Sequence, residues 1–134
     1  MISSDIRQNL IQKAEEAALN SYSPYSKFKV GCALLTEKNQ IFTGTNVENA
    51  SYGLSICAER NAIFSAVAQE GPSMRLKAVV ITSIPNAHLT SPCGACRQVI
   101  AEFGKDIPII FPNGSEYINV PLENLLPYQF IFSV

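Results

Sequence analysis

Cys57-Ala58-Glu59-Arg60 and, further along, Pro92-Cys93-Gly94-Ala95-Cys96 are the two stretches of this sequence that carry most information about its fold. Each stretch opens a segment with helical periodicity, so the cysteines fall at the starts of two predicted helices. The Cys-x-x-Cys spacing lets Cys93 and Cys96 face one point, and a helix N-terminus lowers the pKa of a thiol placed there. A fold that brings the two helix starts together would add Cys57 and complete a three-thiolate metal site.

The three cysteines fit a catalytic zinc site. Such a site has three protein ligands and leaves the fourth coordination position for water. Glu59 follows Cys57 by two residues, so it is offset around the helix and can lean into the site without coordinating the metal. The spacing Cys-x-Glu…Pro-Cys-x-x-Cys is the cysteine form of the zinc-deaminase signature. We therefore predict one Zn²⁺ per subunit on Cys57, Cys93 and Cys96, with Glu59 as the catalytic proton carrier.

Arg60 is a candidate to compensate for the negative charge of such a site. Three thiolates on Zn²⁺ leave one net negative charge, which opposes deprotonation of a bound water unless helix dipoles or a cation compensate for it. Arg60 directly follows Glu59, and Arg97-Gln98 directly follows Cys96. We predict charge compensation at the zinc by Arg60 and Gln98, with Arg60 as the main cation and Arg97 on the surface.

Other interpretations of the cysteines remain open at this point. A Cys-x-x-Cys pair can be redox-active, and Cys32 as a fourth ligand would give a closed structural zinc site. We expect Cys32 to fill the core instead, because it lies in the apolar run Val30-Gly31-Cys32-Ala33-Leu34. The one histidine, His88, precedes Cys93 in a loop and is expected at the surface.

Around these stretches, the periodicity of apolar residues predicts alternating helices and strands. Helical patterns cover residues 3–20, 57–70 and 94–103, with a last helical turn at 122–126. Strand patterns cover a hairpin at 28–35 and 41–47, a buried strand at 76–84, and short strands at 107–111 and 117–120, with a polar loop at 49–56. This order predicts an α/β fold with a mixed sheet and helices packed on its faces.

Length, charge and hydropathy limit the class of protein. The 134 residues fit a single catalytic domain, 1–134, and 47% of them are hydrophobic. Ten Lys and Arg against eleven Asp and Glu give a net charge of -1 with no basic stripe, which argues against a nucleic-acid partner. We expect no membrane span and no signal peptide, because no apolar run approaches about 18 residues and the N-terminus is polar. A cytoplasmic protein with a small, weakly charged substrate is the expectation.

With these features together, the chain resembles the small, homotetrameric class of zinc-dependent cytidine deaminases. Besides the two cysteine stretches, the densest matches are residues 28–31 (Phe-Lys-Val-Gly) and 46–52 (Asn-Val-Glu-Asn-Ala-Ser-Tyr), and the resemblance spans residues 23–127. It implies a three-layer α-β-α architecture with a mixed, mostly five-stranded sheet, a nucleoside substrate, and a homotetramer with shared active sites. The implied reaction is hydrolytic deamination of cytidine and deoxycytidine to uridine and deoxyuridine with release of ammonia, as in pyrimidine salvage.

The resemblance also implies which residues bind the nucleoside. Asn46 and Glu48 would bind the ribose hydroxyls, and they suit this role because residues two apart on a strand end point to one side. Phe28 corresponds to the aromatic residue that lines the pyrimidine pocket. Backbone groups near Ala58 and Ser91 are candidates for the polar edge of the ring.

Three further aromatic residues are implied by the resemblance. Tyr52 and Tyr25 fall in segments that, in the family, lie near the site and the subunit contacts, and Phe130 resembles an aromatic residue that reaches the pocket of a neighbouring subunit. Residues 129–134 are short and apolar where relatives often carry a longer charged tail. Phe132 is therefore an alternative to Phe130.

Three competing functions share part of this pattern. A deaminase of another aminopyrimidine nucleoside, such as a blasticidin-type antibiotic, has the same zinc motifs, although Asn46 and Glu48 favour a ribose. A nucleic-acid-editing deaminase would need a basic surface. A structural zinc module, the alternative without enzymatic activity, would need a fourth protein ligand.

Overall fold

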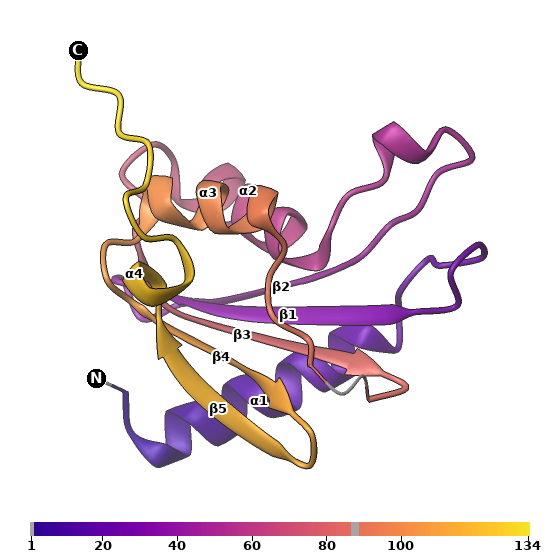
Figure 1. Ribbon diagram of the computed structural model, residues 1–134. Coiled ribbons are helices and arrows are strands. Elements are labelled where there is room, and N and C mark those ends of the chain that lie inside the picture. Colours follow the sequence, from indigo (N-terminus) through magenta and orange to yellow (C-terminus); the bar gives the residue numbers. More distant parts are fainter. Residues whose placement is uncertain (1, 87–88) are drawn as a thin grey trace.

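The computed structural model describes residues 2–86 and 89–134, and its centre is a five-stranded sheet (Figure 1). The strands are β1 (Lys29–Thr36), β2 (Ile41–Thr45), β3 (Leu76–Ile84), β4 (Pro108–Asn113) and β5 (Glu116–Pro121), in the order β2-β1-β3-β4-β5. The β3–β4 pair is parallel, and the other three pairs are antiparallel. The sheet is therefore mixed, as the order of elements predicts.

Helices cover both faces of this sheet (Figure 1). Helix α1 (Ser4–Ala18) packs on one face, and α2 (Ala58–Glu70), α3 (Gly94–Phe103) and the short α4 (Leu122–Leu125) belong to the other. The side chains of β1 show why: Cys32 and Leu34 pack with α2, whereas Ala33 and Leu35 alternate to the face of α1. The three-layer α-β-α prediction is confirmed, and so is the position of Cys32 in the core.

The predicted boundaries differ from the observed ones mainly where the chain leaves the sheet. The hairpin strand predicted to Val47 ends at Thr45, because Val47 forms only isolated bridges with Tyr22 and Ile56. The predicted polar loop contains a short 3₁₀ helix, η1 (Tyr52–Leu54). These irregular pairings lead the chain away from β1 and form the projecting arm that Figure 1 shows between β2 and α2.

A close contact between β2 and α2 fixes the start of α2. A Cβ atom on Gly44 would lie 2.4 Å from the backbone nitrogen of Ala62 and 2.5 Å from the carbonyl oxygen of Ala58, so only glycine fits there. The side-chain amide of Asn61 adds a hydrogen bond of 2.8 Å to the carbonyl of Thr45. The N-terminus of α2 is thereby held beside the residue that follows β2, Asn46.

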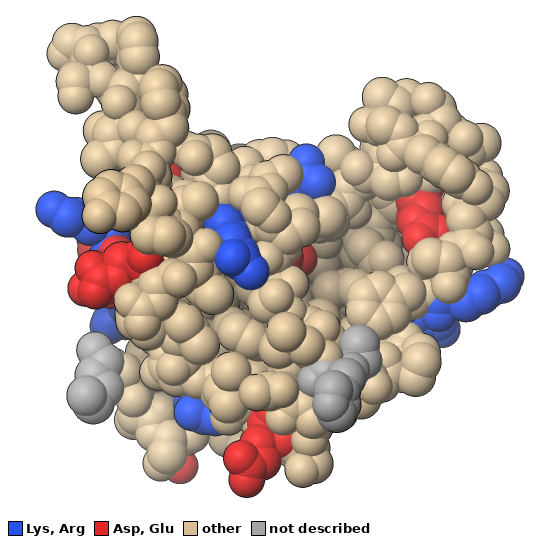
Figure 2. Space-filling view, in the orientation of Figure 1, with Lys and Arg blue, Asp and Glu red and all other residues tan. Residues whose placement is uncertain are grey.

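The distribution of charge on the surface and the length of the helices indicate which kinds of partner are possible. The face of the molecule in Figure 2 carries scattered single Lys, Arg, Asp and Glu side chains and no continuous basic band. Within residues 2–86 and 89–134, no helix has both the length and the apolar character that crossing a membrane requires.

Candidate active site

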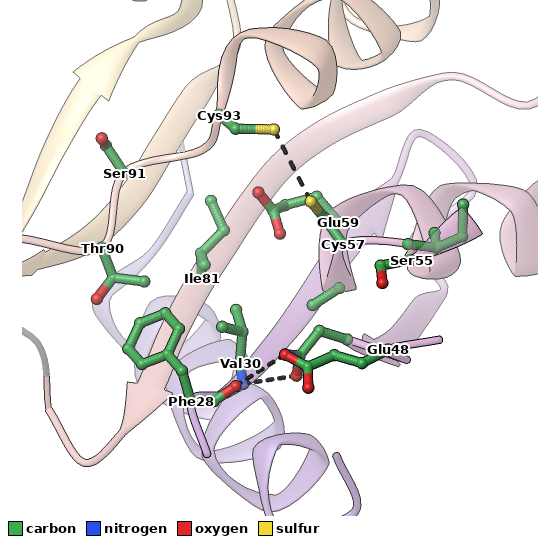
Figure 3. A pocket seen from close by; sticks show the side chains of 13 residues that line it. Phe28, Val30, Glu48, Ser55, Cys57, Glu59, Ile81, Thr90, Ser91 and Cys93 are labelled. Atoms are coloured by element: carbon green, nitrogen blue, oxygen red, sulfur yellow. Dashed lines mark hydrogen bonds between the residues drawn. The ribbon is translucent and has the colours of Figure 1, made fainter. Parts of the chain in front are cut away.

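Two helix starts bring three cysteines together. Cys57 is the N-cap residue of α2, Cys93 is the N-cap residue of α3, and Cys96 lies in the first turn of α3. Their sulfur atoms all lie within 4.8 Å of one another, and the Cys57 and Cys93 sulfurs, which face each other in Figure 3, are 3.8 Å apart. Tetrahedral zinc with bonds of about 2.3 Å to sulfur needs ligand sulfurs about 3.8 Å apart, so the cluster fits this metal.

The fourth cysteine does not join this cluster. Cys32 is fully buried in β1, and burial raises the pKa of its thiol well above the usual value. Within the described part of the chain, the cluster consists of Cys57, Cys93 and Cys96 alone, which leaves a closed four-cysteine site without its fourth ligand. The expected surface position of His88 lies outside the described residues.

Negative charge on the cluster is stabilised from one side by Arg60. Its Nη2 atom donates to the Cys57 sulfur at 3.3 Å. A hydrogen bond from the Cys96 thiol, together with Arg60, lowers the pKa of Cys57 to about 5. The same hydrogen bond raises the pKa of Cys96, and the contact with Cys57 raises the pKa of Arg60. Arg60 therefore lies where charge compensation requires a cation.

The structure does not bring Gln98 to the sulfurs. Its side-chain amide is exposed and donates to the carbonyl of Phe130 at 3.5 Å. Two helical positions beyond Cys96 correspond to a rotation of about 200°, which turns Gln98 to the opposite side of α3. The expectation of a surface Arg97 is also wrong, because this side chain is half-buried and hydrogen-bonded to the backbone.

Glu59 lies beside the sulfurs, with its carboxylate turned toward them (Figure 3). Only 4% of the residue is exposed. Burial raises the pKa of Glu59 to about 7, and the nearby Cys57 adds to this shift. A carboxyl group with such a pKa can both accept and donate a proton near neutral pH.

A cavity of about 280 Å³ opens beside Glu59. This volume suits a small molecule. Apolar side chains form one part of the wall and polar side chains line the end away from the sulfurs (Figure 3). The lining residues are Phe28, Val30, Asn46, Glu48, Ser55, Ile56, Cys57, Ala58, Glu59, Ile81, Thr90, Ser91 and Cys93. The structure thus collects predicted residues from the hairpin, the arm and both metal-bearing helices.

Some of the lining residues were missed by sequence reasoning. Ser55 and Ile81 carry no local signal of a binding role, since one lies in the arm and the other in the central strand β3. Thr90 stands close before Pro92-Cys93, and its nearness to a metal ligand was the available signal.

Asn46 is committed to hydrogen bonds within its own chain. Its Oδ1 atom accepts from the backbone amide of Val30 at 2.9 Å and from the hydroxyl of Ser21. Its Nδ2 atom donates to the carbonyl of Phe28 at 2.8 Å. An amide group has two N–H donors, so one remains for a ligand. Asn46 also holds Phe28, so the polar and aromatic parts of the cavity are connected.

Glu48 is the acidic group of the polar end. Its carboxylate accepts hydrogen bonds from the backbone amides of Tyr25 at 3.0 Å and Ser26 at 3.1 Å, and from the Ser26 hydroxyl. The hydroxyl contact is the largest of the effects that lower its pKa. Glu48 therefore presents a negative charge to the cavity.

Two predicted residues do not line the cavity of their own chain. Tyr52 is 74% exposed on the arm and contacts only the edge of Tyr25 among the aromatic rings described, with ring centroids 5.8 Å apart. Phe130 is 71% exposed on the C-terminal tail beside α3. Tyr52 lines a neighbouring hollow together with Glu48 and Ser55, which also line the cavity. Phe130 lies apart from the cavity, so a role for it at the cavity requires a second subunit.

Comparison with known proteins identifies the family. A family model described as "Cytidine and deoxycytidylate deaminase zinc-binding region" matches residues 4–111. The chain belongs to the cytidine and deoxycytidylate deaminase family. Its resemblance to this family is thereby confirmed, and so is zinc as its metal.

Individual members of the cytidine and deoxycytidylate deaminase family match most of the chain. A probable cytidine deaminase of Dictyostelium discoideum is 44% identical over 93% of this chain and 86% of its own. A cytidine deaminase of Sporosarcina psychrophila is 46% identical over 92% of this chain and 90% of its own. A crystal structure of cytidine deaminase from Burkholderia pseudomallei superposes with a TM-score of 0.85 at 41% identity, covering 96% of this chain and 100% of that one. A blasticidin-S deaminase of Bacillus cereus is only 25% identical over 90% of this chain and 89% of its own.

Proposed function

We propose that this chain is a zinc-dependent hydrolase that converts cytidine and deoxycytidine to uridine and deoxyuridine and releases ammonia. The observation that carries the proposal is the position of Glu59, buried between the three cysteine sulfurs and a nucleoside-sized cavity. A redox pair or a structural zinc module has no need of a buried proton carrier with a pKa near neutrality. The family members named cytidine deaminase support the same substrate class.

The chemistry follows from the groups at the metal end of the cavity. Cys57, Cys93 and Cys96 hold the metal, and Arg60 offsets part of their charge. Zinc, when bound there, lowers the pKa of water toward about 7 and so supplies a nucleophile at neutral pH. Glu59 accepts the proton that the water loses and delivers it to N3 of the pyrimidine while the oxygen bonds to C4. Glu59 then moves the remaining proton of the added oxygen to the amino group, and the C4–N bond breaks as the C4=O double bond forms, so that ammonia leaves.

The sugar and the base are held by the other end of the cavity. Asn46 donates its remaining N–H to a ribose hydroxyl, and Glu48 accepts a hydrogen bond from a ribose hydroxyl. Phe28 packs beside the pyrimidine ring. Ala58 and Ser91 also line the cavity, and we propose that their backbone groups bind the polar edge of the base.

The charge of the cavity favours a nucleoside over a nucleotide. Glu48 is negative, and none of the described lining residues is Lys or Arg. A 5′-phosphate would need cationic partners such as arginine and would be repelled by Glu48. We therefore place the substrate among the cytidine nucleosides rather than deoxycytidylate.

We further propose a homotetramer in which subunits share active sites. The arm and the tail expose large apolar side chains at Tyr52, Leu54, Phe130, Ile131 and Phe132. These two segments project on either side of a hollow surface in Figure 2. Exposed apolar groups gathered in this way mark interaction sites. Phe130, or Phe132, would then complete the cavity of a neighbouring subunit.

We also propose that residues 1–134 form a single catalytic domain, that the protein is cytoplasmic and that it acts in pyrimidine salvage. Four unpaired cysteines suit a reducing compartment. The scattered charges of the visible face suit a small substrate rather than a nucleic acid (Figure 2).

The test measures the deamination of a panel of substrates by the zinc-loaded protein, with ultraviolet absorbance as the readout. We expect turnover of cytidine and deoxycytidine, with deoxycytidylate and blasticidin S at least about 100-fold poorer in kcat/KM, as loss of 3 kcal/mol would give. Preference for the antibiotic would replace the proposed substrate. Zinc binding without turnover of any of these substrates would contradict the proposed function.

A further inference from the structure

Arg97 makes an unusual set of contacts for a residue beside a metal ligand. It directly follows Cys96 on α3, yet its guanidinium is directed to oxygen atoms of the chain. Nε donates to the carbonyl of Pro92 at 2.7 Å, Nη1 donates to the carbonyl of Leu125 at 2.8 Å, and Nη2 lies 3.4 Å from the Ser91 hydroxyl. One planar group thus connects the segment before α3 with the last residue of α4.

The acceptors belong to the metal site and to the cavity wall. Pro92 is bonded to Cys93, and Ser91 lines the cavity. The backbone amide of Arg97 also donates to the carbonyl of Cys93 at 3.0 Å. Arg97 therefore holds the residues on both sides of the Pro92–Cys93 peptide bond, through its side chain on one side and through its backbone on the other.

Cys93 depends on such contacts more than the other ligands do. Cys96 is buried and Cys57 is half-buried, whereas Cys93 is exposed. Thr90, which lies three residues before Cys93, is held by a hydrogen bond from its amide to the carbonyl of Pro112 and by a hydrogen bond between its hydroxyl and that of Ser83. Between Thr90 and α3, Pro92 is buried and the Cys93 sulfur contacts that of Cys57, and the side chain of Arg97 adds hydrogen bonds to Pro92 and Ser91.

We propose that Arg97 is a positioning residue that fixes the Ser91–Cys93 segment, so that the Cys93 sulfur stays in register with Cys57 and Cys96. The rigid fork of a guanidinium suits this role because it donates in two directions at once. Lysine at the same position keeps the positive charge but cannot donate to the carbonyls of Pro92 and Leu125 in the same way from two separate nitrogen atoms. Zinc retention is the direct readout, and it does not depend on the proposed nucleoside substrate.

The experiment measures zinc release from zinc-loaded protein to the chromophoric chelator 4-(2-pyridylazo)resorcinol. Groups that orient metal ligands typically contribute about 10–100-fold to metal affinity, and we expect release from Arg97→Ala to be about tenfold faster than from the parent. Arg97→Lys should release zinc about threefold faster or more, since the donors of its ammonium lie on one nitrogen atom, which replaces the separate guanidinium nitrogens that bond Pro92 and Leu125.

Arg75→Ala is the matched control. Arg75 also donates to two backbone carbonyls, those of Pro72 at 3.1 Å and Met74 at 2.7 Å, before β3 and apart from the metal site. We expect its zinc release within about twofold of the parent. Equal acceleration in Arg75→Ala and Arg97→Ala would assign the effect to general stability and overturn the proposal.

Hydrogen exchange of the metal-free proteins gives a second readout that needs no zinc loading. In Arg97→Lys and Arg97→Ala, the hydrogen-bonded amides at the start of α3, beginning with that of residue 97, which donates to the carbonyl of Cys93, should exchange several-fold faster, while those in the middle of α2 keep the parent rate. Parental zinc release and parental exchange in Arg97→Ala would overturn the proposal. Full restoration of both by lysine would also overturn it, because charge rather than the fork would then be sufficient.

Discussion

Gly44 lies where strand β2 passes under the start of α2, and replacing it by alanine perturbs the site from a distance. The added Cβ would lie 2.4 Å from the Ala62 nitrogen, about 1 Å short of the 3.4 Å at which ordinary contacts begin. The neighbouring atoms are helix backbone, so either α2 or β2 must move by about this amount. Overpacking of this kind typically costs about 1–3 kcal/mol of stability. A 1 Å displacement of catalytic groups can cost about 100-fold in rate.

We therefore expect Gly44→Ala to lower the free energy of unfolding by about 1–3 kcal/mol in chemical denaturation, and to reduce kcat on cytidine by about 100-fold. Gly53→Ala is the control, because a Cβ on this residue of the arm has no atom within 4 Å. Its stability should stay within about 0.5 kcal/mol of the parent. Gly44→Ala with parental stability and parental turnover would refute the argument that β2 sets the position of Cys57 and Glu59.

Two further predictions concern charged groups around the cavity. Glu48→Gln should lower kcat/KM for cytidine about 10–100-fold through loss of a charge-assisted hydrogen bond to the sugar. The turnover of 1-methylcytosine, which lacks the sugar, should be unaffected, and an equal loss on both substrates would exclude a sugar contact. Hydrogen bonding lowers the pKa of Glu48 in the folded state. The ionised carboxylate therefore stabilises the fold above the unfolded-state pKa, and this stabilisation is lost as the pH falls through the folded-state pKa. The free energies of unfolding of the parent and of Glu48→Gln should consequently converge at acidic pH. Arg60→Gln removes the cation 3.3 Å from the Cys57 sulfur. In the plot of kcat against pH, the acidic limb should then move to higher pH by about one unit. An unchanged acidic limb at equal zinc content would argue against charge compensation by Arg60.

The sequence predicts the parts of the fold that repeat locally. The strand at residues 76–84 matches β3 in both of its bounds, and the helix at 94–103 matches α3, because apolar periodicity and helix-ending glycine are local signals. The same locality explains why each cysteine lies at a helix start, whereas the meeting of Cys57 with Cys93 and Cys96 depends on how the sheet places α2 and α3. The alternation of side chains along β1 predicts its two buried faces for the same reason.

The contacts that sequence reasoning missed join residues distant along the chain. Arg97 was expected at the surface, yet one of its partners is the carbonyl of Leu125, a backbone atom with no residue-type signal. The arrangement of Asn46 with Ser21 and Phe28 depends on how the arm returns to β1. Gln98 was assigned from adjacency to Cys96, but adjacent helical residues face different directions.

We propose that Glu59 moves protons and does not hold the metal. The most direct measurement is zinc content together with single-turnover deamination of cytidine for Glu59→Gln, which removes the ionisable group and keeps the shape of the side chain. We expect one zinc per chain and a rate lower by about 10²–10⁴-fold, the typical contribution of a general acid–base group. Parental turnover, or loss of zinc in parallel with activity, would contradict the assignment.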